Sequence, residues 1–87
     1  MFTVKIKRKA LKNLAKIDQE QKRHLKENVF LLKNDPLPFK KTDICKLKGY
    51  DNTYRIRIGT IRIVYDVLWK QKTILIHYVG TREKAYS

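Results

Sequence analysis

The stretch YRIRIGTIRIVY, residues 54–65, contains two strands and the turn that joins them. Apolar side chains alternate with basic ones on both sides of Gly59-Thr60, which is typical of strands with one buried face. A two-residue connection with glycine first favours a type II′ hairpin turn. Such a turn sets the pairing register of the two strands, so Arg57 is expected to lie directly opposite Arg62.

This register sorts the side chains of the hairpin onto two faces, because alternate residues of a strand point in opposite directions. The apolar face, which should pack on helices, contains Tyr54, Ile56, Ile58, Ile61, Ile63, Tyr65 and Val67. The opposite face contains Arg55, Arg57 and Arg62, and its nearest acidic residue is Asp66. If the next strand keeps the same alternation, the second face also includes Val64, Leu68, Leu75, His77 and Val79.

The three arginines have no evident structural use. Arg57 and Arg62 face each other, and like charges placed in this way destabilise a sheet by about 0.2–1 kcal/mol. A phosphate group would offset that cost, since guanidinium groups bind phosphate oxygens through charge-assisted and often bidentate hydrogen bonds. The alternative interpretation is that all three side chains simply point into water.

The remaining patterns predict a single α+β domain over residues 1–87. We expect a strand at 2–7, helices at 9–17 and from Asp18 to about 33, a loop at 35–45, a short strand entry at 46–49, and strands at 53–58, 61–69 and 72–79. Asp18 is predicted to cap the second helix, with Gln21 completing a capping box. The two helices should form a hairpin on one face of a mainly antiparallel sheet, whose last three strands form an antiparallel meander.

The charge of the chain points to a polyanionic partner. Twenty-one Lys and Arg against eight Asp and Glu give a formal net charge of +13. Residues 1–44 carry twelve basic and five acidic side chains, and residues 45–87 carry nine and three, so the excess is spread through the folded body. Such self-repulsion is relieved by nucleic acid or by an acidic protein. The alternative is a generally basic, solubilising surface.

Several other functional classes lack support in the sequence. Cys45 is the single cysteine, so no internal disulfide forms, and one Cys with two His does not match a zinc-site spacing. We therefore expect no metal and no cofactor. No apolar run approaches about 20 residues, and the N-terminus lacks a signal-peptide core. We expect a soluble, cytoplasmic protein, in which His77 is a packed or solvated strand residue rather than a catalyst.

Four segments resemble the RelE branch of the RelE/ParE toxin superfamily, and the resemblance covers nearly the whole chain. They are KLKG at 46–49, YRIRI at 54–58, RIVY at 62–65 and VGTRE at 79–83. The resemblance implies a toxin of a type II toxin–antitoxin pair, an mRNA interferase that cleaves mRNA in the ribosomal A site and inhibits translation. It also implies that a cognate acidic antitoxin of the RelB kind neutralises the toxin.

The resemblance assigns roles to individual residues. It implies catalytic roles for Arg57, Arg62, Arg82 and Tyr86, and we expect RNA contacts from Arg55, Lys46, Lys48 and Lys84. The implied reaction is attack of a ribose 2′-hydroxyl on the adjacent phosphate, with arginines stabilising the developing charge. The best-known members have lysines at positions 55 and 57, and arginine keeps its proton. The general base therefore stays open between Tyr86, water and a ribosomal group.

Two other functions are compatible with the same sequence. A ParE-type toxin has the same fold but inhibits DNA gyrase and has no nuclease activity, and it should not need all four of the catalytic residues named above. A non-catalytic basic RNA- or ribosome-binding module would bind RNA with a steep dependence on salt and would release no cleavage products. The antitoxin could act by covering the arginines or by displacing the C-terminal tail, and the sequence does not choose between these modes.

Overall fold

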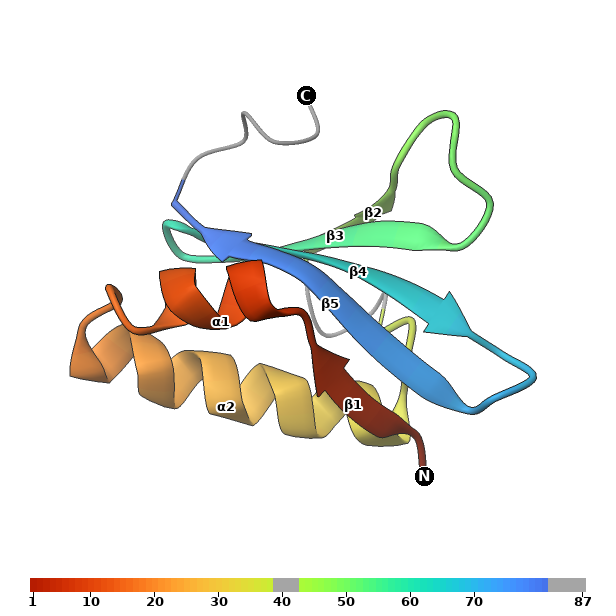
Figure 1. The fold of residues 1–87 in the computed structure, drawn as a ribbon, viewed down its shortest axis with the longest axis horizontal. Helices are drawn as coiled ribbons and strands as arrows, with labels where there is room; N and C mark the ends of the chain where they lie inside the picture. The colour runs from red at the N-terminus through yellow and green to blue at the C-terminus, as the bar shows by residue number, and fades with distance from the viewer. Residues whose placement is uncertain (39–42, 82–87) are drawn as a thin grey trace.

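The computed structural model describes residues 1–38 and 43–81, which form one five-stranded sheet with two helices on one side (Figure 1). The elements are β1 (Thr3–Ile6), α1 (Arg8–Leu14), α2 (Gln19–Asn34), β2 (Asp43–Lys46), β3 (Thr53–Ile58), β4 (Ile61–Leu68) and β5 (Thr73–Gly80). The strand order is β1-β5-β4-β3-β2, with β1 parallel to β5 and every other neighbour antiparallel. The predicted α+β class, with helices packed on a mainly antiparallel sheet, is confirmed. No helix within the described ranges is long and apolar enough to span a membrane.

The helical hairpin follows the predicted capping signals, with one difference at the end of α1. The backbone N–H of Gln21 donates to Asp18 Oδ1 at 2.8 Å, which confirms Asp18 as the N-cap of α2. Helix α1 ends at Leu14 rather than Ile17. The chain there tightens into i→i−3 hydrogen bonds, one of them from Ile17 N–H to the Leu14 carbonyl. This tightening brings Ile17 into the core, where it is 8% exposed.

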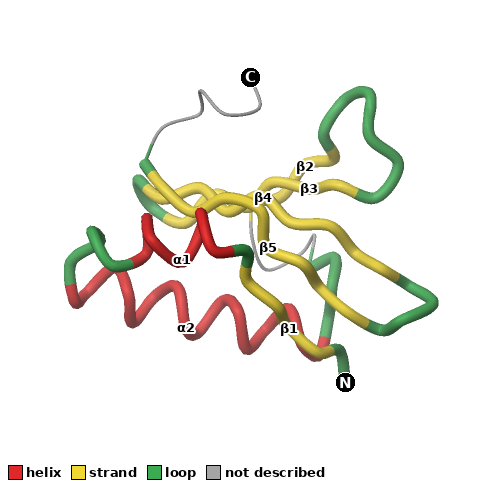
Figure 2. Tube along the Cα trace, in the orientation of Figure 1, coloured by secondary structure: helices red, strands yellow, loops and turns green. Residues whose placement is uncertain are grey.

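The core lies between the helices and the predicted apolar face of the sheet, as Figure 2 shows for the two layers. The buried residues are Ala10, Ile17, Leu25, Leu32, Tyr54, Ile56, Ile61, Ile63, Tyr65, Val67, Ile74, Ile76 and Val79. The pairing of β3 with β4 matches the predicted register at every position, from Ile58 with Ile61 to Tyr54 with Tyr65. Gly59 takes a φ of 59°, as the first turn position requires.

The second strand was placed wrongly by the sequence pattern. The predicted loop at 35–45 contains most of β2, and the predicted strand entry at 46–49 is mainly a turn. β2 is an edge strand with polar residues at both ends, so its own sequence carries little strand signal. Its pairing is supplied by the free side of β3, an example of tertiary context overriding intrinsic propensity.

A β-bulge in β5 changes which side chains reach the face opposite the helices. Val64 pairs with Tyr78, but Tyr65 pairs with Ile76, so His77 is the extra residue. The expected uninterrupted alternation of β5 is therefore wrong beyond this point. Val79 packs in the core at 1% exposure instead of facing away from the helices, and Tyr78 takes its place on the outer face.

Candidate functional site

The strand pairing arranges the face opposite the helices into three rows, and we call this surface the arginine face. The first row, read from β2 to β5, is Asp43, Arg57, Arg62 and Gly80. The second row is Cys45, Arg55, Val64 and Tyr78. The third row, from β3 to β5, is Thr53, Asp66 and Leu75, with His77 beside them in the bulge. Paired residues of antiparallel strands lie about 4.5–5.5 Å apart, so the three predicted arginines are neighbours.

The first row contains two arginines and one carboxylate. Arg57 Nε lies 3.4 Å from Asp43 Oδ2, and the two side chains are 43% and 59% exposed. Arg62 Nη1 donates to the carbonyl oxygen of Thr81 at 3.3 Å. Asp43 was not expected on this face, because the sequence pattern placed it in a loop. An ion pair this exposed contributes little stability, below about 1 kcal/mol.

The third row contains a compact hydrogen-bonded cluster that sequence reasoning missed. Thr53 Oγ1 donates to Asp66 Oδ1 at 2.5 Å, and His77 Nε2 lies 2.5 Å from Asp66 Oδ2. The His77 and Asp66 side chains are 14% and 23% exposed. The cluster links β3, β4 and β5 next to the bulge. The Asp66 carboxylate is therefore hydrogen-bonded within the third row and does not form an ion pair with the arginines of the first row. Alternation along β5 had placed His77 on this face, but its contact with Asp66 depends on how β5 pairs with β4 and was not predicted.

The other predicted RNA-binding residues are distributed differently. Arg55 is half-buried in the second row, beside Val64, which is only 4% exposed. Lys46 pairs with Tyr54 and therefore lies on the helix side of the sheet, away from the arginines. Lys48 is exposed in the loop between β2 and β3, which extends away from the helices (Figure 1). Arg82, Lys84 and Tyr86 lie outside the described residues.

On the buried face, the ionisation of Tyr65 differs from that of an ordinary tyrosine. Its side chain is fully buried, and its hydroxyl donates to the Pro36 carbonyl at 2.8 Å. Burial raises the pKa of Tyr65 well above its usual value, with smaller contributions from Tyr54 and Asp35. The phenol therefore acts as a hydrogen-bond donor that connects the sheet to the chain after α2.

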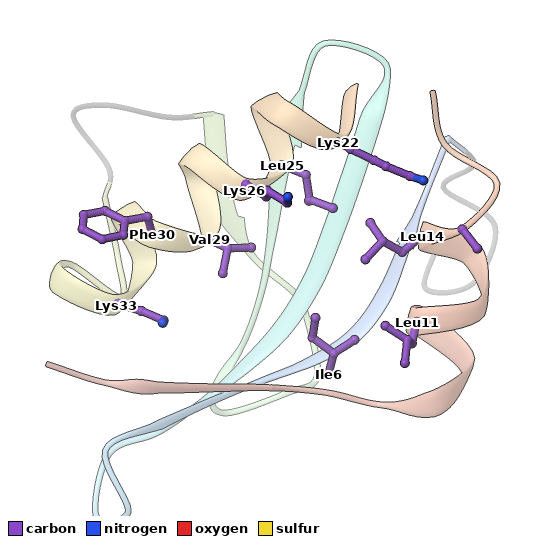
Figure 3. Close-up of a pocket in the computed structure, with 10 residues that line it drawn as sticks. Ile6, Leu11, Leu14, Lys22, Leu25, Lys26, Val29, Phe30 and Lys33 are labelled. Carbon is purple, nitrogen blue, oxygen red and sulfur yellow. The ribbon is translucent and has the colours of Figure 1, made fainter. Parts of the chain in front are cut away.

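A second surface feature lies on the helix side, and we call it the lysine-rimmed groove. It is an apolar groove of about 580 Å³ between α1, α2 and the end of β1 (Figure 3). Its lining residues are Ile6, Leu11, Leu14, Ala15, Lys22, Leu25, Lys26, Val29, Phe30 and Lys33. Leu11 is 53% exposed and Phe30 is 62% exposed, so the groove presents apolar side chains to solvent. Its three lysines come from α2, and the first and last are eleven positions apart, which corresponds to about 16 Å of helix.

Comparison with known proteins agrees with this architecture. Residues 4–86 match the family model described as the ParE toxin of the type II toxin–antitoxin system parDE, and the chain belongs to this toxin family. Within the family it is of the RelE kind. A protein of Methanocaldococcus jannaschii that carries the toxin name RelE1 is 41% identical over 85 residues, covering 98% of this chain and 94% of that protein.

Solved structures give the same assignment. RelE in the archaeal RelE–RelB complex from Pyrococcus horikoshii superposes with a TM-score of 0.84 at 33% identity, covering 95% of this chain and 97% of that chain. The isolated RelE toxin of E. coli has a TM-score of 0.79 at 22% identity, covering 99% and 92% of the two chains. The second likeness, at this identity, supports the fold alone.

Proposed function

We propose that this toxin is a ribosome-dependent endoribonuclease that cleaves mRNA in the ribosomal A site and thereby inhibits translation. The observation that supports this function most directly is the first row of the arginine face, where Arg57 and Arg62 are cross-strand partners. Two cations held this close bind an anion lying between them more strongly than either would alone. A phosphodiester is the anion that RNA presents.

In the proposed reaction, the 2′-hydroxyl oxygen of a ribose forms a bond to the adjacent phosphorus, and the bond from phosphorus to the following 5′-oxygen breaks. The products are a 2′,3′-cyclic phosphate and a 5′-hydroxyl, whose oxygen takes up a proton as it leaves. Negative charge builds on the phosphate oxygens, and Arg57 and Arg62 stabilise it while Arg55 orients the strand. Arginine keeps its proton, so the 2′-hydroxyl proton goes to another acceptor. The family resemblance adds Arg82 to the phosphate site and Tyr86 to the proton transfer. Lys84 would contact the RNA backbone.

The test is cleavage of an mRNA positioned on purified ribosomes, mapped by primer extension. The wild-type protein should cut within the A-site codon, and Arg62→Ala should cut at least about 100-fold more slowly, as for loss of one transition-state donor. Arg23→Ala is the matched control, because Arg23 lies on α2 and is exposed, where it pairs with Glu27. Equal rates for Arg62→Ala and wild type would contradict the proposed role of the first row.

The matching family model is described as a ParE toxin, and the ParE-type alternative considered above gives a second candidate function, inhibition of DNA gyrase. A gyrase supercoiling assay with the same protein preparation separates the two functions. Under the proposed function, supercoiling continues at the uninhibited rate while ribosome-bound mRNA is cut. Inhibited supercoiling without any mRNA cleavage would replace the nuclease assignment with the gyrase one.

We further infer that a cognate acidic antitoxin binds this chain, since the Pyrococcus relative was solved with RelB. The lysine-rimmed groove fits an amphipathic helix, with apolar residues against Leu11 and Val29 and acidic residues beside the lysines. Leu11→Ser should weaken binding of the antitoxin encoded alongside by about tenfold or more. Lys12→Ser, on the same helix but outside the groove, is the control. Equal antitoxin affinity for both variants would contradict this docking site.

A further inference from the structure

The β5 bulge places an aromatic residue on the arginine face that neither the sequence pattern nor the resemblance selected. Tyr78 pairs with Val64 in the second row, beside the row that contains Arg62. Its half-buried side chain points to the same side of the sheet as the arginines. With unbroken alternation from Ile76, Tyr78 would instead have pointed into the core.

The position of the Tyr78 ring follows from its neighbour Gly80. A Cβ added to Gly80 would lie 2.5 Å from the Tyr78 hydroxyl oxygen and 2.8 Å from its Cζ. The phenol therefore lies across Gly80, in space that only glycine leaves open. Gly80 is the cross-strand partner of Arg62, so the hydroxyl reaches from the second row into the first.

Arg62 extends toward the same point. Its guanidinium donates to the carbonyl of Thr81, the residue that follows Gly80. The Tyr78 hydroxyl, at Gly80, and the Arg62 guanidinium, at Thr81, thus lie at adjacent positions at the end of β5, in the part of the face that also contains Arg57. Within the described ranges, no residue forms a hydrogen bond with the Tyr78 hydroxyl, and guanidinium groups can only donate. An acceptor bound beside the arginines would receive the hydrogen bond that the Tyr78 hydroxyl can donate.

We propose that Tyr78 is a further RNA-binding residue, whose hydroxyl donates a hydrogen bond to the phosphate held by Arg57 and Arg62. Gly80 has the matching role of leaving room for the ring. A neutral donor strengthens binding of an anion without adding to the repulsion between the two arginines. The proposal rests on RNA as the ligand of the arginine face, and it holds whether or not cleavage follows binding.

The first experiment measures the Kd of the purified full-length protein for a fluorescently labelled, single-stranded RNA of ten nucleotides at several salt concentrations. Tyr78→Phe keeps the ring and removes the donor, and its Kd should rise about tenfold, as for loss of a hydrogen bond to a charged group. Its salt dependence should equal that of wild type, because no charge is lost. Arg62→Ala should lower the salt slope by about one. The matched control, Tyr50→Phe, alters an exposed tyrosine of the β2–β3 loop and should leave the Kd unchanged.

A double-mutant cycle gives a second, independent test. Gly80→Ala should raise the Kd severalfold in the wild-type background, because its methyl group displaces the ring of Tyr78. In the Tyr78→Ala background the same substitution should change the Kd less than twofold, because there is no ring to displace. Additive effects would show that Gly80 does not act through Tyr78 and would overturn this part of the proposal.

The outcomes separate this proposal from the proposed nuclease function. If Tyr78→Phe binds RNA within twofold of wild type while Arg62→Ala binds much more weakly, the role of Tyr78 is refuted and the arginine site stands. If wild type binds RNA in a Tyr78-dependent way but cuts no ribosome-bound mRNA, the nuclease function fails and the Tyr78 contact stands. A wild-type protein without measurable affinity for this RNA overturns the Tyr78 proposal, and the ribosome assay then decides the nuclease function by itself. Thermal melting of each variant shows that it is folded.

Discussion

The first and third rows of the arginine face both cross β3, β4 and β5, but their charged side chains have opposite surroundings. In the third row, the Asp66 carboxylate is in hydrogen-bond contact with Thr53 and His77, and the side chains are largely buried. In the first row, Arg57 and Arg62 face each other, and Arg57 pairs with an exposed carboxylate, Asp43, from an edge strand.

This difference indicates that the third row stabilises the sheet, whereas the first row binds a ligand. The third row satisfies its polar groups within the protein, which is what a buried cluster needs to be favourable. The first row places two like charges opposite each other across the ladder, and a bound anion would offset the cost of that arrangement. Removing the Asp66 charge from the third row should therefore destabilise the fold, whereas removing the arginine charges from the first row should weaken function.

The largest expected effect is on activity, from the double variant Arg57→Ala/Arg62→Ala. Cleavage of ribosome-bound mRNA should fall more than about 1000-fold, because both groups that stabilise the phosphate charge are lost. The unfolding free energy should stay constant or rise by up to about 1 kcal/mol, since the cross-strand repulsion is removed. Urea denaturation monitored by circular dichroism measures the stability. A large loss of stability would show that the arginines belong to the structure after all.

The opposite result is expected from Asp66→Ala. This substitution leaves Thr53 and His77 without their shared acceptor, and it should lower the unfolding free energy by about 2 kcal/mol. Asp43→Ala is the matched control in the first row, and its effect should stay below about 1 kcal/mol because that ion pair is exposed. Both values come from urea denaturation at pH 7. If Asp66→Ala and Asp43→Ala lose the same unfolding free energy, the proposed difference between the two rows is contradicted.

A smaller effect, on the buried side of β4, concerns alkaline pH. The folded state raises the pKa of Tyr65, so between about pH 10 and that raised pKa only the unfolded chain loses this proton. Tyr65 then makes the unfolding free energy fall with pH, by up to about 1.4 kcal/mol per pH unit. Tyr65→Phe has no phenol to ionise at this position, so its unfolding free energy lacks this pH dependence. The difference in unfolding free energy between Tyr65→Phe and wild type should therefore shrink as the pH rises above 10. A difference that stays constant with pH would contradict the effect.

The sequence predicted the features that depend on neighbours along the chain. The Gly59-Thr60 turn and the alternation around it were enough to pair β3 with β4 correctly and to place Arg55, Arg57 and Arg62 on one face. Asp18 was recognised as a helix cap for the same reason, since its partner Gln21 is three residues away.

Features that depend on distant pairing could not be predicted in this way. Asp43 reaches Arg57 only because β2 adds to the free edge of β3, and β2 has little strand pattern of its own. Tyr78 reaches the arginine face only because β5 contains one extra residue relative to β4. A bulge of this kind leaves no mark in the local alternation, which is why Val79 was assigned to the wrong face.

By itself, then, the sequence determined the fold class, the excess of positive charge and the cross-strand pair of arginines, since each follows from composition or from residues close together in the chain. Tertiary structure alone decided that Asp66 is engaged by Thr53 and His77 and that Tyr78 lies over Gly80 beside Arg62. The physical reason is that strand register between β4 and β5 is a property of two strands packed on a common core, and neither strand specifies it alone.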